Sequence, residues 1–120
     1  MNLAPVEIKA FVPARALPAS LDFYRALGFE IPWHNEELAY VRHGSTSFLL
    51  QRFYVKEHAE NFMMHMLVEN ADDWYEHVVK SGVVPKFGVH LGKPEDRPWG
   101  IRDFTLSDPA GVLWRIGQNL

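Results

Sequence analysis

The chain has 120 residues, of which 48% are hydrophobic, so it is long enough for one domain (residues 1–120) and too short for two independent ones. Its formal net charge of −3 and its scattered Lys and Arg residues exclude a basic surface for phosphate backbones, so we expect no nucleic-acid partner. The absence of cysteine excludes disulfides and thiol chemistry, and no segment approaches the roughly 18 apolar residues of a membrane helix, so we expect a cytoplasmic protein without a membrane partner.

The first elements in chain order are a strand, a helix and three further strands. Ile8 to Val12 shows the alternation of a strand. Pro18 suits the first turn of a helix that runs to Leu27, and Gly28 suits the left-handed conformation that ends a helix. Short strands are then predicted at about residues 29–33, 38–42 and 47–53.

The second part of the chain repeats this order. Phe62 to Val68 alternates as a strand, Asn70 is a suitable N-cap, and the helix that follows ends at Gly82. Strands are predicted near residues 83–87, 101–107 and 112–118. Residues 88–100 form an insertion rich in Gly and Pro, and long loops of this kind often bind ligands. The repeat predicts two tandem βαβββ modules, at about residues 1–57 and 58–120.

Two segments resemble a known family. The segment from Leu17 to Phe29 resembles the opening signature of the vicinal oxygen chelate superfamily, which contains glyoxalases, bleomycin-resistance proteins and extradiol dioxygenases. The segment from Pro98 to Gly111 is similar to the corresponding stretch of bleomycin-resistance proteins. The resemblance implies an α+β fold in which curved mixed sheets form a cleft and helices cover their convex faces.

The resemblance also indicates where metal ligands would lie. Metalloenzymes of this superfamily bind one divalent ion through His or Gln on the first strand of each module and through Glu on the last strands. Aligning the modules places Lys9, Met63 and Arg115 at three of these positions, and none of them suits a divalent ion. His65 is the histidine expected on the cleft face, but it cannot form a site alone. We therefore expect no metal, cofactor or catalytic residue.

The expected ligand-binding residues come from the cleft faces and the long loop. The resemblance places Trp99 at an aromatic position on which bleomycin-type drugs stack, and His65 at a second groove position that is aromatic in some relatives. Leu38 stands where another aromatic is expected, and Trp33 replaces it in part. Arg115 and Lys9 could receive an anionic group or pair with Glu7, Glu30 or Asp103. The complete set is Trp99, His65, Leu38, Trp33, Phe11, Met63, Leu50, Arg115 and Lys9.

Three functions are compatible with the sequence. The first is non-enzymatic binding and sequestration of a small aromatic molecule, such as a bleomycin-type or other aromatic antibiotic, which would provide antibiotic resistance. The second is a metal-dependent glyoxalase-like isomerase or lyase, or a dioxygenase, that uses His65. The third is a protein-interaction module of the same fold with a filled cleft. Because each module leaves its concave face uncovered, the resemblance implies a homodimer with composite clefts.

Overall fold

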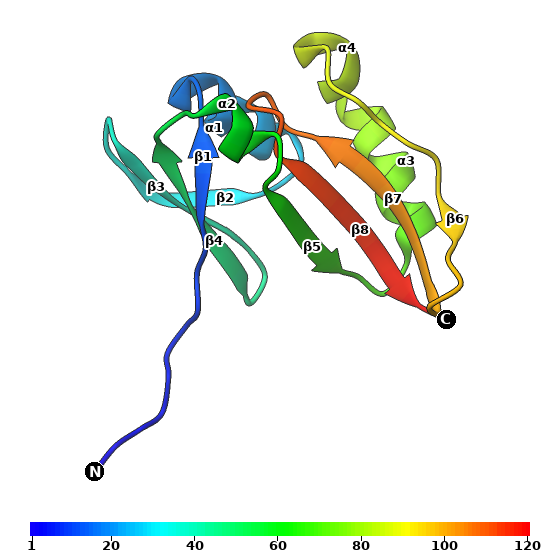
Figure 1. Cartoon of the computed structure of the whole chain (residues 1–120), viewed down its shortest axis with the longest axis horizontal. Coiled ribbons are helices and arrows are strands. Elements are labelled where there is room, and N and C mark those ends of the chain that lie inside the picture. The colour runs from blue at the N-terminus through cyan, green and yellow to red at the C-terminus, as the bar shows by residue number, and fades with distance from the viewer.

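Both halves of the chain form the same βαβββ unit (Figure 1). The computed structural model describes all 120 residues. The first half contains β1 (Phe11–Ala14), α1 (Leu17–Ala26), β2 (Glu30–His34), β3 (Leu38–His43) and β4 (Thr46–Arg52). The second half contains β5 (Met63–Leu67), α3 (Ala71–Ser81), β6 (Glu95–Asp96), β7 (Ile101–Ser107) and β8 (Leu113–Asn119). Two short helices, α2 (Lys56–Ala59) and α4 (Val83–Phe87), complete the structure.

The two sheets have the same topology. Their strand orders are β1-β4-β3-β2 and β5-β8-β7-β6. In each sheet the first strand pairs in parallel with the last, and the remaining pairs are antiparallel. The predicted α+β fold of two tandem modules is therefore confirmed. None of its helices combines the length and the apolar character needed to cross a membrane.

Local sequence signals place the ends of the two long helices. Pro18 lies in the first turn of α1, where an amide hydrogen would have no partner within the helix. Gly28 and Gly82 have φ values of +92° and +77°, so each takes the left-handed conformation at the end of a helix. Asn70 caps α3 by accepting a hydrogen bond from the backbone N–H of Asp73 at 3.0 Å.

Two predicted strands differ from the structure. The first strand begins at Phe11 rather than Ile8, since Ile8 is 92% exposed and belongs to an extended N-terminal arm. Residues 83–87 form the helix α4 instead of a strand. The two valines favour a strand, but Val83 fills the core and the ring of Phe87 lies 5.6 Å from that of Phe23 on α1, so tertiary packing overrides the local preference.

One core joins the halves. The ring of Trp114 on β8 packs against Tyr24 of α1 and Phe48 of β4, with centroids 5.9 and 5.2 Å away. The Tyr24 hydroxyl donates a hydrogen bond of 2.7 Å to Asp108, which lies in the turn before β8, and accepts one of 2.9 Å from the Trp114 indole. Asp108 is only 2% exposed. This network therefore connects the helix-covered faces of both sheets through hydrogen bonds in the core.

Replacing Asp108 by Asn should remove part of the pH dependence of stability. Burial raises the pKa of Asp108 from 3.8 to about 6 in the folded protein, so ionisation disfavours the folded state. The corresponding contribution to the free energy of unfolding should fall by about 3 kcal/mol as the pH rises from about 4 to about 6, and then remain constant. Denaturant unfolding across this pH range measures the effect. The decrease in the free energy of unfolding should be absent in Asp108→Asn and present in the exposed control Asp22→Asn. Identical pH profiles for Asp108→Asn and the wild type would contradict the prediction.

Candidate functional site

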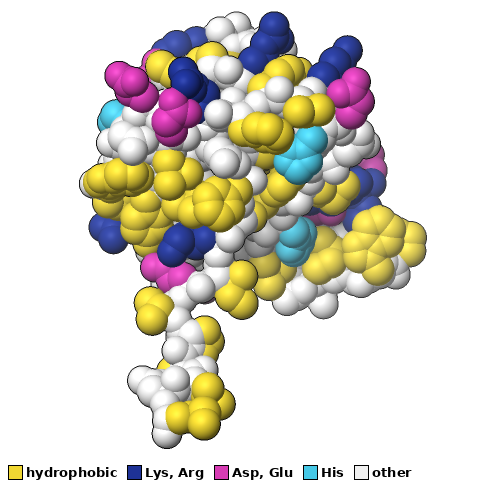
Figure 2. Space-filling view, turned by 60° about the vertical axis from the view of Figure 1, so that its left-hand side comes forward, with side chains coloured by type: hydrophobic (Ala, Val, Ile, Leu, Met, Phe, Trp, Pro, Cys, Tyr) yellow, Lys and Arg dark blue, Asp and Glu magenta, His cyan; other side chains and the backbone are white.

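Each sheet has one face that no helix covers. In Figure 1, α3 lies behind β7 and β8 and leaves their near face free. We call the helix-free faces the open faces. Large apolar side chains are about half exposed there: Phe11 52%, Trp33 50%, Met63 56% and Leu67 54%. Figure 2 shows hydrophobic side chains gathered at the surface above the N-terminal arm. Exposed apolar surface of this extent is typical of ligand or partner sites.

The open face of the first sheet carries an aromatic row. The strand register aligns Phe11 of β1 with Leu49 of β4, Leu49 with Tyr40 of β3, and Tyr40 with Trp33 of β2. Neighbouring strands lie about 4.8 Å apart, so these four side chains cross the sheet as one line. The row offers flat apolar groups on which an aromatic ring could stack.

The open face of the second sheet carries a polar row. The register aligns His65 of β5 with Arg115 of β8, and Arg115 with Thr105 of β7. The Thr105 hydroxyl lies 2.9 Å from His90 Nε2, which brings the loop of residues 88–100 to this edge of the sheet. Met63 and Leu67 flank His65 on the same face of β5. This face therefore combines a central cation with apolar neighbours.

The end of the arm next to β1 lies against the first open face. Glu7 accepts hydrogen bonds from Ser47 at 2.7 Å and Tyr40 at 3.2 Å, and it pairs with Lys9 at 3.0 Å. The hydrogen bond from Ser47 is the main reason that the pKa of Glu7 lies below its usual value. Lys9 also lies 5.5 Å from the centre of the Tyr40 ring. Lys9 is therefore already paired with a carboxylate within the chain.

The remaining predicted site residues are not members of these rows. Leu50 is a correction to the predicted set, because it is fully buried in the core while its neighbours Leu49 and Gln51 face the other side of β4. Leu38 is half-buried and aligns with Gln51, next to the aromatic row. Trp99 is 66% exposed in the turn before β7, so it does not close the loop as a buried plug.

Two residues of the aromatic row were missed by sequence reasoning. Tyr40 and Leu49 belong to the aromatic row, and the alternation within their strands could have indicated them. Asp103 is 2% exposed and accepts hydrogen bonds from Arg97 at 2.7 Å and Arg115 at 3.3 Å. The pairing of Arg115 with Asp103 was among the options that the sequence left open. The contact of Arg97 with Asp103 was not, because Arg97 reaches Asp103 from the long loop.

The residues present do not fit a divalent metal ion. No group of three or more His, Asp or Glu side chains in the structure could hold one. The buried carboxylate of the second open face, Asp103, is bound to two guanidinium groups. His65 has Arg115 as its neighbour on the adjacent strand, and this positive charge opposes a nearby cation.

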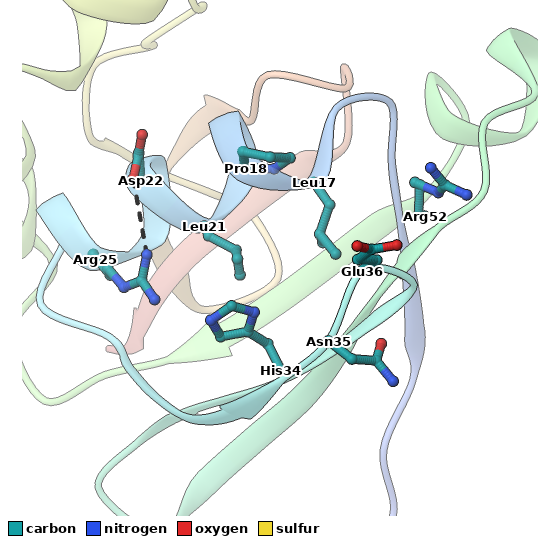
Figure 3. Close-up of a pocket in the computed structure, with 9 residues that line it drawn as sticks. All are labelled: Leu17, Pro18, Leu21, Asp22, Arg25, His34, Asn35, Glu36 and Arg52. Atoms are coloured by element: carbon teal, nitrogen blue, oxygen red, sulfur yellow. Dashed lines mark ion pairs between the residues drawn. The ribbon is translucent and has the colours of Figure 1, made fainter.

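A separate hollow of about 590 Å³ lies between α1 and the end of β2. In Figure 3, Leu21 of α1 points toward His34 and Leu17 points toward Glu36, and charged side chains form the rim. Arg25 pairs with Asp22 at 3.8 Å, so part of this charge is compensated locally. The hollow contains none of the predicted ligand-binding residues.

Comparison with protein families gives one match. Residues 7–116 match the model of the Glyoxalase/Bleomycin resistance protein/Dioxygenase superfamily. None of the curated proteins compared with the chain matches it.

Solved structures with the same fold include both binding proteins and an enzyme. The bleomycin-binding protein of bleomycin-producing Streptomyces verticillus, complexed with copper(II)-bleomycin, has a TM-score of 0.81 and 23% identity, covering 96% of this chain and 97% of that one. A bleomycin resistance determinant encoded on transposon Tn5 has a TM-score of 0.78 and 20% identity, covering 96% and 98%. Lactoylglutathione lyase from Agrobacterium tumefaciens has a TM-score of 0.69 and 17% identity, covering 96% and 94%. At these identities the likeness shows the fold alone.

The purified protein should retain no stoichiometric divalent metal. The reason is that Lys9, Met63 and Arg115 stand at the expected ligand positions and that Asp103 is occupied by arginines. Elemental analysis after incubation with Ni²⁺, Zn²⁺ or Mn²⁺ and dialysis should give far less than one ion per chain. About one ion per chain, lost in His65→Ala and kept in the control His34→Ala, would overturn the prediction.

Proposed function

The chain belongs to the Glyoxalase/Bleomycin resistance protein/Dioxygenase superfamily, and we propose that it is a non-enzymatic protein that binds and sequesters a small aromatic molecule. The observation that carries this proposal is the row of Phe11, Leu49, Tyr40 and Trp33 across an uncovered sheet face. Stacking on such side chains adds about 0.5–1.5 kcal/mol per aromatic pair to the energy of burial. The metal ligands that an enzyme of this superfamily would need do not accompany the row.

The proposed ligand class is a bleomycin-type or other aromatic antibiotic. Support comes from solved structures of the same fold, which include a protein complexed with copper(II)-bleomycin and a resistance determinant. A binder present in excess lowers the free antibiotic concentration in the cytoplasm by mass action, without chemical change of the drug. Sequestration of this kind would provide resistance.

The open faces of a single chain are not filled by its own side chains. Phe11 and Met63 remain 52% and 56% exposed, which argues against the alternative of a protein-interaction module with a filled cleft. A ligand on one open sheet would be covered on one side only, whereas small-molecule sites usually bury most of the ligand. The binding function therefore requires a second surface opposite each sheet.

The second surface is proposed to come from another copy of the chain. In a twofold symmetric homodimer, the module of residues 1–57 faces the module of residues 58–120 of the partner, and each pair of open faces encloses one cleft. The N-terminal arm supports this arrangement, since its apolar residues Leu3, Val6 and Ile8 are 81%, 95% and 92% exposed. Pro5 favours an extended arm because its φ is fixed and it lacks an N–H group.

Replacing Trp99 by Ala should weaken ligand binding without unfolding the protein. Trp99 is 66% exposed, so its removal leaves the core intact, whereas loss of a stacking contact costs roughly 1–3 kcal/mol of binding free energy. Calorimetric titration with bleomycin measures the change in Kd. The control Val79→Ala, on the outer side of α3, should bind as the wild type does. Unchanged affinity in Trp99→Ala would reject its role in stacking.

Light scattering should give a stable mass near twice the 13.8 kDa of one chain, with two ligands bound per particle. Ile8 is 92% exposed in the single chain and is proposed to contact the partner. Ile8→Asp should therefore lower the mass toward one chain, because it places a charge in that contact. The control Asn2→Asp adds the same charge at a polar position of the arm. A concentration-independent mass of one chain in the wild type would contradict the dimer.

A further inference from the structure

The two open faces carry corresponding rows of different chemistry. Because the helices and their glycine ends repeat along the chain, the parallel pair Phe11–Leu49 in the first sheet corresponds to the pair His65–Arg115 in the second. One row is aromatic and aliphatic, and the other presents an imidazole and a guanidinium group. A cleft made from one face of each kind would have an apolar wall and a cationic wall.

Arg115 is fixed in place by a buried carboxylate. Its Nη1 donates to Asp103 at 3.3 Å, and Asp103 is also bound by Arg97 at 2.7 Å. Gly117 lies opposite Asp103 on β8, and a Cβ at this glycine would lie 3.1 Å from the Asp103 Cβ. The glycine therefore leaves room for Asp103 beneath the arginines. Ordering a long side chain in advance lowers the entropy cost of binding to it.

One edge of the Arg115 guanidinium group remains available. Its Nε and Nη2 donate no hydrogen bond within the chain, and the side chain is 31% exposed. Two adjacent N–H groups on one edge match the two oxygens of a carboxylate. His65 lies beside Arg115 on the neighbouring strand and can donate a further hydrogen bond.

We propose that Arg115, oriented by Asp103 and assisted by His65, binds a carboxylate of the ligand, and that the preferred ligands are aromatic carboxylates. This inference rests on the proposed binding function. The aromatic part would contact Met63 and Leu67 beside His65 and the aromatic row on the opposite wall of the cleft. A polycationic ligand fits this face poorly, because both oxygens of Asp103 are already bound by arginines.

The hollow of Figure 3 is the other place where an anion could bind, since Arg25 and Arg52 line it. Each of these arginines already pairs with an exposed carboxylate, Arg25 with Asp22 and Arg52 with Glu37. Arg25 therefore provides a matched control for Arg115, as an arginine in an ion pair that lies on a different surface.

The test compares three probes with the same ring and different charge: 2-naphthoate, 2-naphthylmethanol and 2-naphthylmethylamine. Isothermal titration calorimetry of the full-length wild type should show that the carboxylate binds at least about tenfold more tightly than the alcohol, and the amine most weakly. Arg115→Met should remove this preference, so that the carboxylate binds no more tightly than the alcohol. Arg115→Lys should retain part of the preference because the charge remains, and Arg25→Met should retain all of it.

Each other outcome overturns the inference. If the wild type binds the three probes equally and Trp99→Ala weakens all of them, the ligand preference is wrong while the proposed binding function stands. A preference that survives Arg115→Met, or that is lost in Arg25→Met, places the anion elsewhere. If none of the probes binds, both the inference and the binding of simple aromatic molecules are contradicted.

Discussion

The structure depends on one constraint: a four-stranded sheet has two faces, and one helix can cover only one of them. Both helix-covered faces contribute to the same core, where Tyr24 of the first half contacts Asp108 and Trp114 of the second. The helices of both halves therefore pack against this core, and none of them covers the opposite face of a sheet. The opposite faces remain uncovered, and the exposed apolar residues follow from this arrangement rather than from a local defect in packing.

The same constraint links the fold to the proposed chemistry. The helix-covered faces, which the Tyr24 network connects, pack into one core, and strand register determines which side chains share a row on the opposite faces. Because the duplicated units have diverged in sequence, the outward rows differ, with an aromatic wall in one and Arg115 beside His65 in the other. A twofold pairing of two chains, in which each module faces the other module of the partner, would bring unlike walls together. Such a cleft suits an amphipathic ligand better than a uniformly apolar one.

Much of the fold could be predicted from sequence because its signals are local. Pro18, Gly28 and Asn70 specify helix ends through backbone conformation and hydrogen bonding, and the structure places each of them as expected. The errors arose where tertiary contacts decide. Val83 lies in a short helix because its side chain packs in the core there. Leu50 faces the core, whereas the prediction placed it in the cleft, because a shift of one residue in a strand reverses the face. The ion pairs of Asp103 join a loop to two strands, so no single segment indicates them.

The most direct test of binding at the open faces uses the four methionines as reporters. Met63 is 56% exposed on the open face of β5, whereas Met64 and Met66 pack against the core. In NMR spectra of protein labelled with ¹³C at the methionine methyl groups, addition of 2-naphthoate should shift the Met63 signal and leave Met66 nearly unchanged. Met66 lies on the helix-covered side of the strand, beside Trp74 and Trp114. A shift of Met66 without a shift of Met63 would contradict binding at the open faces.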